Sequence, residues 1–502
     1  MHIRKIWPSL PLLLLSLAFY FGVVRYFGQA YIDDTFISLR YSKNFLNGAG
    51  ITWNPGEAPV EGYTSLAWVL FTALASGGNT DKLLSASVHG SMFWGGALIV
   101  LAWVVAVFCL RIRPLLAVLL PLHLGVSPFL ARHGGSGMET TLAAFAMMMH
   151  AGLVVLAVRN PTAKWAVILG LSAGLLPMVR PDAIFFAAPS AIAAIALPTF
   201  LDRRKMMRLI LIFGATAGAI IGGFLLWKLR YYGNVVPIPA VFKTGFHEVV
   251  RHPAYIVSHW LTFATAVAVP AAIIALGAAT DRAWIDRPVL VVLVGVIPFA
   301  LYFLTALPVK SFEFRYLFPA YGIIFLLALA VLNNALPRKL DARGFAAFAL
   351  VFIFCNSGYL SGVHQQLEQV HERYRKYSTL GRELSRIPNL SIALTEAGQL
   401  PYYSNAKVID LLGLNDRMIA RNRFRGAAFA ADFRKYLETE TGLPDVYMVS
   451  GMEASWASLA VQRDLLIEKY IIVSEDPVVE GVRKDAPHAT ELIEILRKNP
   501  VE

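Results

Sequence analysis

The sequence is poor in charged residues and in cysteine. Only 16% of its 502 residues are charged, against about 25% in an average soluble protein. Hydrophobic residues make up 57% of the chain, and the mean hydropathy is +0.56. A soluble globular fold cannot bury so much apolar surface, so that class is excluded and lipid must surround most of the chain. The two cysteines, Cys109 and Cys355, lie in apolar stretches, which excludes a disulfide framework or a cysteine metal site.

Acidic residues are scarcer than basic ones, and the net charge is +12. In a soluble protein this excess is typical of nucleic-acid binding. Here many of the basic residues sit in short loops between apolar stretches, which is the positive-inside pattern and also suits anionic lipid headgroups. We therefore predict membrane lipids, and no nucleic acid, as partners.

Apolar stretches of membrane-spanning length recur as far as residue 362. They predict about eleven transmembrane helices, near 8–27, 87–109, 114–131, 139–158, 164–180, 183–201, 209–227, 256–280, 288–307, 318–336 and 344–362. No small-x-small cleavage site follows the first stretch, so we interpret it as a helix and not as a signal peptide. The segment 63–77 is apolar but short, and it is predicted to lie on the membrane surface or to be re-entrant.

The basic loops orient these predicted helices. The basic clusters at 4–5, 111–113, 159–164, 203–208, 282–287 and 338–343 all fall on one side, which the positive-inside rule places in the cytoplasm. The loops 28–86, 228–255 and 308–317 then lie outside, and so does the C-terminus.

The composition changes near residue 364, where charge rises and apolar runs shorten to strand length. Strands are predicted at 391–395, 408–412, 446–450 and 470–474, with helices between them at 427–440 and 455–468. Strands that alternate with helices indicate a small α/β domain. We predict a membrane module over 1–363 and an extracytoplasmic α/β domain over 364–502.

Two adjacent carboxylates, Asp33 and Asp34, follow the first predicted helix. At a membrane surface, one can act as general base while its neighbour holds a metal or tunes its pKa. The alternative is a solvated helix start, where acids offset the helix dipole. Trp53 and Tyr63, farther along the same loop, can stack on a sugar ring or anchor the loop at the membrane interface.

Several short motifs together resemble one glycosyltransferase family of the GT-C class, the terminal arabinofuranosyltransferases of the mycobacterial cell wall and their bacterial relatives. The resemblance covers nearly the whole chain. It is carried by Asp33 to Tyr63 with Arg40-Tyr41, Asn47-Gly48, Trp53-Asn54-Pro55-Gly56 and Glu61-Gly62-Tyr63-Thr64; by Gly137-Met138-Glu139-Thr140; by Val179-Arg180-Pro181-Asp182; by Tyr231-Tyr232-Gly233-Asn234 with Pro237 and Lys243; by Arg315-Tyr316-Leu317-Phe318-Pro319; and by Glu396-Ala397-Gly398, Pro401-Tyr402-Tyr403-Ser404 and the stretch from Ile409 to Asp416.

The resemblance implies a polytopic GT-C-like fold in a bacterial cytoplasmic (inner) membrane and a polyprenyl-phosphate sugar as donor. The sugar implied is arabinofuranose or another pentose, and the acceptor is an envelope glycan or glycolipid. It also places an acid of the first outer loop at the reaction centre, so we expect Asp33 to be the base and Asp34 to orient it or to bind a divalent cation (Mg²⁺, Mn²⁺ or Ca²⁺). The chain departs from the family at 237–241, where Pro-Ile-Pro-Ala-Val replaces a more polar segment that is expected to face the substrate. The identities of the donor sugar and of the acceptor are therefore the part of the resemblance that this departure affects.

The other candidate residues have assigned roles. Cations at outer helix ends can stabilise the leaving phosphate, although long basic side chains also snorkel to headgroups; these are Lys243, Arg315, Arg180, Arg132 and His133. Predicted substrate contacts are Arg40, Trp53, Asn54, Glu61, Tyr63 and Glu139, and, at strand ends of the outer domain, Glu396, Tyr402, Tyr403, Asp410, Asn415 and Asp416. Glu139 also suits a simple helix start, and the outer-domain residues also suit turns and domain docking.

Two other classes of function stay open. A transporter or flippase of lipid-linked sugar often has repeated halves and a midplane site, and the sequence has no repeated halves. A non-catalytic envelope protein, which binds glycan and supports an assembly such as a flagellar motor, would tolerate Asp33→Asn and Asp34→Asn.

Overall fold

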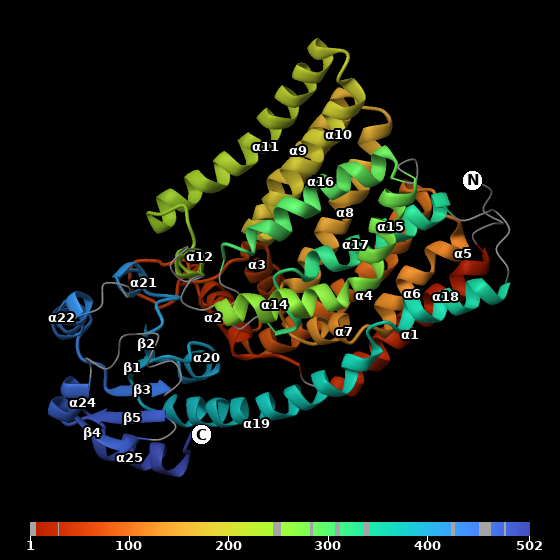
Figure 1. Ribbon diagram of the computed structural model, residues 1–502. Coiled ribbons are helices and arrows are strands. Elements are labelled where there is room, and N and C mark those ends of the chain that lie inside the picture. Colours follow the sequence, from red (N-terminus) through yellow and green to blue (C-terminus); the bar gives the residue numbers. More distant parts are fainter. Residues whose placement is uncertain are drawn as a thin grey trace.

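The chain forms a helical bundle with a small α/β domain at one end (Figure 1). This computed structural model describes residues 7–501 except 29, 244–252, 282–284, 307–311, 336–341, 423–426, 451–462 and 476–477. Within these residues, seven helices are long and apolar enough to cross a membrane, and nine if each of two bent pairs counts as one span. The prediction of a multi-pass membrane protein is confirmed.

The seven long helices coincide with predicted spans. They are Trp7–Phe27, Thr80–Cys109, Thr140–Arg159, Pro181–Thr199, Arg203–Tyr232, Phe318–Ala335 and Ala346–Leu384. The first six contain α1 (Leu10–Phe27), α4 (Leu83–Val104), α8 (Thr140–Arg159), α10 (Ile184–Thr199), α11 (Arg203–Tyr232) and α17 (Phe318–Ala335). The last contains most of α18 (Ala342–Phe354) and all of α19 (Leu360–Leu384). Two more predicted spans are helical but shorter, α9 (Ala163–Val179) and α16 (Arg287–Tyr302). The core of the bundle includes α8 and α17, whose residues are largely buried.

The segment predicted to lie at the surface contains α3 (Leu66–Ala75). Ten residues of helix span about 15 Å, half the hydrocarbon thickness of a bilayer. Its buried face packs on α2 (Asp33–Leu46) and α4. The short helix therefore braces the first loop against the bundle.

Two predicted continuous spans are broken, and those predictions are wrong. The helix over 114–131 bends by 60° between Val126 and Pro128, and the helix over 256–280 bends by 70° between Ala266 and Ala268. Pro128 begins α7 (Pro128–Gly134) after α6 (Leu119–Val126), because the residue before proline is driven out of helical geometry. In the other pair, α14 (Pro253–Ala266) and α15 (Ala268–Thr280), Pro270 lacks the N–H that would bond the Ala266 carbonyl.

A polar network inside the bundle joins the two breaks. The Asn356 side-chain amide donates to the Ala266 carbonyl at 3.0 Å and to the Tyr321 hydroxyl at 2.7 Å. That hydroxyl also lies 2.6 Å from His123 Nε2 and 3.5 Å from the Ser127 hydroxyl at the first break. Backbone groups freed by a break need such partners within a membrane.

Replacing Asn356 by leucine should therefore destabilise the protein. The substitution leaves the Ala266 carbonyl without its amide donor, at an expected cost of about 1–2 kcal/mol in the free energy of unfolding. Thermal unfolding in detergent measures this loss of stability. Ser357→Ala is the control, because the exposed Ser357 hydroxyl donates to the nearby Phe354 carbonyl. An effect no larger than the control would contradict the assigned role.

The C-terminal domain is built on a five-stranded sheet in the order β2-β1-β3-β5-β4. Its strands are β1 (Ser391–Leu394), β2 (Lys407–Asp410), β3 (Val446–Ser450), β4 (Tyr470–Ser474) and β5 (Val478–Arg483). β1 pairs in parallel with β2 and β3, whereas β5 is antiparallel to β3 and β4. The four predicted strands are confirmed; β5 was missed because Glu480 and Gly481 interrupt its apolar run.

The helices of this domain are short, except for the one that leads into it. They are α20 (Gln399–Ser404), α21 (Arg417–Asn422), α22 (Ala427–Tyr436), α24 (Arg463–Lys469) and α25 (Ala489–Lys498). The predicted helix over 427–440 is α22 followed by a π-helical turn, Leu437–Thr441. Of the predicted helix over 455–468, residues 455–462 lie outside the described chain. The long α19 runs from the bundle into this domain (Figure 1), and the division at 363 stays a prediction.

The buried carboxyl of Glu480 should make the sheet pH-sensitive. Glu480 is 1% exposed, and burial raises its pKa to about 7. Because the folded state holds this proton more tightly than the unfolded chain, the stability that it contributes is complete below about pH 4 and is lost as pH rises through 7. Glu480→Gln should raise stability at pH 8 by roughly 1–3 kcal/mol and leave it unchanged at pH 4.

Thermal unfolding followed by circular dichroism at both pH values would test this expectation. Glu494→Gln, on the exposed face of α25, is the matched control. An equal gain at both pH values would contradict the titration of Glu480.

Candidate active site

Segments far apart in the sequence meet at one end of the bundle, beside the C-terminal domain. The start of α2 carries Asp33 and Asp34 in its first turn. The Thr35 hydroxyl accepts from the Ile32 N–H at 3.3 Å and donates to the Ser136 carbonyl at 2.9 Å. This contact fixes the start of α2 against the turn that leads into α8.

The two aspartates point to different partners. Asp33 is 2% exposed, and its Oδ1 accepts from the Gln399 N–H at 2.7 Å. Gly398 packs directly on the Asp33 carboxyl, leaving no room for a Cβ. Asp34 instead forms an ion pair with Arg315, with 3.3 Å between Oδ2 and Nη1. Asp33 thus joins α2 to the C-terminal domain, whereas Asp34 faces a basic group.

Arg315 is buried and held from several sides. It donates to the Tyr316 hydroxyl at 2.9 Å and lies 3.2 Å from the Met138 sulfur. Its Nε atom has no hydrogen-bond partner among the described residues. Burial alone would lower the pKa of Arg315, but Tyr316 and Asp34 raise it above its usual value. The guanidinium is therefore permanently charged and keeps an unused donor.

A second guanidinium, that of Arg180, lies nearby. It makes a bidentate contact with Asp182 at 3.0 and 2.6 Å, and its Nη1 is 3.9 Å from Glu139. This Nη1 also has no hydrogen-bond partner among the described residues. The ring of Tyr316 lies beside both guanidiniums, 5.4 Å from Arg180 and 4.8 Å from Arg315.

Both arginines line one pocket, which we call the guanidinium pocket. It encloses about 90 Å³, and its polar lining consists mainly of Thr64, Glu139, Arg180, Asp182, Arg315 and Tyr316. Pro239 and Ala240 of α12 (Ile238–Lys243) also line it. Two buried guanidiniums with unused N–H donors suit an oxyanion of a phosphate.

Three other predicted phosphate ligands have different surroundings. Arg132 bonds the Ala30 carbonyl and lies 3.5 Å from Glu313, and His133 Nε2 is 3.3 Å from the Glu313 carbonyl. These contacts hold the segment just before Arg315, and neither residue lines the guanidinium pocket. Lys243 ends α12, but its side chain lies outside the described residues.

The predicted substrate contacts in the first loop meet the C-terminal domain. Arg40 is 4% exposed and stacks on Trp53 at 4.6 Å. Its hydrogen bonds go to Trp53 O, Asn54 Oδ1, Pro401 O and Ala406 O. Asn54 exchanges two 3.0 Å hydrogen bonds with the backbone of Val408, and Trp53 Nε1 donates to the same carbonyl. Trp53 and Asn54 thus bind the loop to β2, and Arg40 binds it to the segment just before β2.

Glu61 and Tyr63 connect the same loop to α11. Glu61 pairs with Lys228 at 2.8 Å, and the Tyr63 and Tyr232 hydroxyls are 2.9 Å apart. Burial raises the pKa of Glu61 to about 7, although Lys228 favours its ionised form. Lys228 and Glu313 were not predicted from the sequence, and Asp182 was named only as part of a motif. The sequence offered a signal for each: Lys228 is a charged residue at the end of an apolar run, and Asp182 and Glu313 each lie two residues from an arginine.

The predicted outer-domain residues divide into a group that packs within the protein and a pair that lines a larger pocket. Asp410 accepts four hydrogen bonds, from the backbone of Leu412, Gly413 and Asn415 and from the Asn415 amide, and so forms the turn after β2. Tyr402 donates to Thr80 O, Tyr403 lies against Arg382, and Glu396 lines a small cavity of about 10 Å³.

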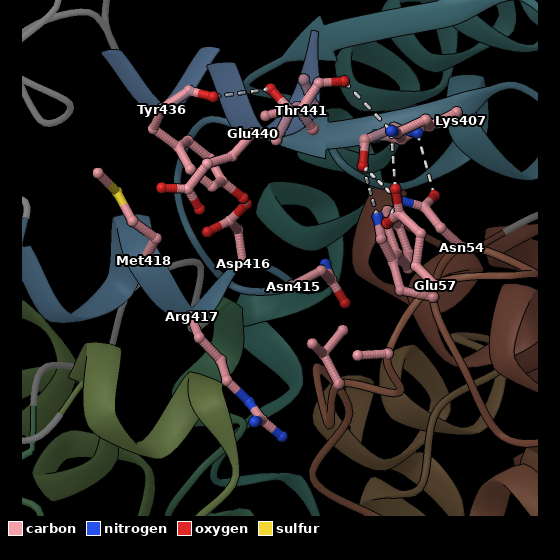
Figure 2. Close-up of a pocket in the computed structure, with 15 residues that line it drawn as sticks. Asn54, Glu57, Lys407, Asn415, Asp416, Arg417, Met418, Tyr436, Glu440 and Thr441 are labelled. Atoms are coloured by element: carbon pink, nitrogen blue, oxygen red, sulfur yellow. Dashed lines mark hydrogen bonds and ion pairs between the residues drawn. The ribbon is translucent and has the colours of Figure 1, made fainter. Parts of the chain in front are cut away.

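Asn415 and Asp416 line a larger pocket between the first loop and the C-terminal domain, which we call the junction pocket (Figure 2). It encloses about 350 Å³, and its polar lining includes Asn54, Glu57, Lys407, Asn415, Asp416 and Tyr436. Within the described residues, no group of three or more His, Cys, Asp or Glu side chains is placed to hold a metal ion. The role of a divalent cation at Asp34 stays a prediction.

Comparison with known proteins identifies the fold. Residues 363–489 match a protein family described as a domain of unknown function, DUF8728. No curated protein matches the chain. Among solved structures, ArnT from Cupriavidus metallidurans bound to undecaprenyl phosphate is similar, with a TM-score of 0.57 and 14% identity over 94% of this chain and 98% of that one. The archaeal oligosaccharyltransferase AglB from Archaeoglobus fulgidus, in complex with an inhibitory peptide and a dolichol-phosphate, has a TM-score of 0.59 and 12% identity over 97% of this chain and 75% of that one. At these identities the likeness concerns the fold, and it confirms a polytopic GT-C-like membrane fold with a small C-terminal α/β domain.

Proposed function

We propose that the protein is a GT-C glycosyltransferase that moves a sugar from a polyprenyl-phosphate donor to a hydroxyl of an envelope glycan or glycolipid. The observation that carries this proposal is the ion pair between Asp34 and Arg315, because Arg315 lines the guanidinium pocket together with Arg180. Two solved structures of the same fold are of proteins bound to undecaprenyl phosphate or dolichol-phosphate. A base beside two phosphate-binding cations is the arrangement that this reaction needs.

The proposed reaction is a single displacement. The Asp34 carboxylate takes the proton of the acceptor hydroxyl, whose oxygen bonds to the anomeric carbon. The bond from that carbon to the phosphate oxygen breaks, and its electron pair stays on the polyprenyl phosphate. Arg315 and Arg180 stabilise the growing negative charge. No step is assigned to a divalent cation, whose binding at Asp34 stays a prediction.

Several finer points are proposals of the same kind. Arabinofuranose or another pentose as the sugar rests on the family resemblance alone. A place in the bacterial inner membrane, with the C-terminal domain outside, rests on the basic loops and the positive-inside rule. Asp33 was the expected base, but its contact with Gln399 favours Asp34 for that role.

The test is sugar transfer by the purified protein in lipid nanodiscs. It would be given labelled polyprenyl-phosphate arabinose, a panel of other polyprenyl-phosphate sugars and crude envelope glycan. Label should appear in the glycan with at least one donor. No transfer from any donor, by protein that is folded, would overturn the proposal.

One feature favours a transporter of lipid-linked sugar as the second candidate. Broken helices are common in transporters, and two of them meet near Tyr321. However, the Ala266 carbonyl freed by one break already accepts a hydrogen bond from the Asn356 amide, so it is not left to bind a substrate or an ion. A flipping assay in liposomes separates the two functions, because a transporter would move the donor across the bilayer without an acceptor.

A further inference from the structure

We propose that the junction pocket binds the acceptor glycan, at sugars one or two units away from the hydroxyl that is modified. That the bound glycan is the acceptor rests on the proposed function, whereas binding of a glycan can be measured without catalysis. The pocket volume of about 350 Å³ falls in the range of small-molecule sites. Its walls come from the first loop and from the C-terminal domain, so it exists only when the two are docked.

Polar side chains face each other across this pocket. Figure 2 shows Asp416, Tyr436 and Glu440 on one side and Asn54, Glu57 and Lys407 on the other, with Asn415 between them. Polar contacts hold four of these groups in place. The Tyr436 hydroxyl donates to Asp416 at 2.7 Å, and Lys407 pairs with Glu57 at 2.8 Å. Polar groups held in this way recognise a ligand with little loss of entropy.

The charges of the lining exclude anionic ligands. Three carboxylates, Glu57, Asp416 and Glu440, stand against two cations, Lys407 and Arg417. Both cations are already engaged, Lys407 by Glu57 and Arg417 by the backbone carbonyls of Pro59 and Tyr232. A phosphate or an acidic polymer would therefore meet net negative charge.

A neutral, hydroxylated ligand fits this lining best. Carboxylates accept hydrogen bonds, lysine donates them, and asparagine does both, while each sugar hydroxyl can donate and accept. Val408, Ile409 and Met418 also line the pocket, and their apolar atoms can pack against the C–H faces of a sugar ring. The chemistry therefore matches a neutral glycan.

The junction pocket is close to the proposed reaction centre. Val60 lines the junction pocket and Thr64 lines the guanidinium pocket. Four residues of chain span at most about 14 Å. In addition, α12 lines the guanidinium pocket and packs against α21, which lines the junction pocket. A glycan held in one pocket can therefore present its end to the other.

The experiment measures binding of lipid-free neutral oligosaccharides of two to six sugars, prepared from the native envelope, to the full chain in nanodiscs without donor. Ala58→Trp places an indole in the pocket, since Ala58 is an exposed lining residue. Glu440→Gln removes one carboxylate. We expect Kd to rise at least about tenfold in the first variant and about threefold or more in the second.

Two matched controls should bind like the wild type. Lys498→Trp adds the same ring on α25, and Glu438→Gln removes a carboxylate two residues from Glu440 that pairs with Arg434 outside the pocket. No binding by the wild type, binding unchanged in Ala58→Trp, or preferential binding of a neutral peptide of matched length would each overturn the inference. Glycan binding without transfer would overturn only the proposed function, and transfer with an unchanged acceptor KM in Ala58→Trp would overturn only this site.

Discussion

Asp34→Asn is expected to lower kcat for sugar transfer by about 10²–10⁴-fold, the usual contribution of a general base. The amide keeps the shape of the side chain but cannot take the acceptor proton. The binding of donor should change less than kcat, because both guanidiniums remain. Steady-state transfer in nanodiscs, with kcat and KM measured separately for donor and acceptor, gives the result.

Asp33→Asn is the matched comparison. Its amide oxygen can still accept the N–H of Gln399, so we expect transfer to fall by less than about tenfold. The opposite order, with a large loss at Asp33 and a small one at Asp34, would show that Asp33 is the base and would refute the assignment made from the geometry. Circular dichroism of both variants establishes that they are folded.

Arg315→Gln is expected to remove most of the binding energy for the lipid phosphate. The substitution deletes one of two buried guanidiniums at the pocket, and we expect kcat/KM for the donor to fall by about 10²–10³-fold. Polyprenyl phosphate, which is the proposed leaving group, should also stabilise the wild type against heat, by about 2.7 kcal/mol at a hundred times its Kd. This stabilisation should be largely absent in Arg315→Gln.

The thermal shift needs no sugar donor, so it tests the phosphate site separately from catalysis. Arg382→Gln serves as the control, because Arg382 is exposed and lies against Tyr403 away from the pocket. A shift by polyprenyl phosphate that is the same in wild type and Arg315→Gln would place the phosphate elsewhere. A neutral polyprenol of the same length should produce no shift in either protein.

Much of the fold could be predicted from the sequence because its signals are local. An apolar stretch such as 318–336 favours the membrane over water whatever the rest of the chain does. In the structure this stretch forms α17. Short apolar runs such as 446–450 became strands for a similar reason. Breaks were harder to predict: Pro128 and Pro270 both occur in apolar stretches, as does Pro298, which lies inside the unbroken α16. The partners that satisfy the freed backbone decide which proline breaks a helix.

The candidate site was predictable as a set of residues and not as an arrangement. Asp33, Asp34, Arg180, Arg315 and Glu139 were singled out from motifs, and all of them lie at one end of the bundle. Their roles differ because of their partners. Arg40 and Asp410, which looked equally suited to bind substrate, are saturated by hydrogen bonds from the surrounding chain.

The sequence by itself therefore determined that this protein lies in a membrane, where most of its helices run and that an α/β domain follows them, since these properties depend on the polarity of neighbouring residues. Only the tertiary structure decided which aspartate pairs with an arginine of the guanidinium pocket. Asp34 meets Arg315 across 281 residues of sequence, and Asp33 meets Gln399 across 366. Two adjacent and chemically identical side chains differ only in what the folded chain brings to them, and no local pattern encodes that difference.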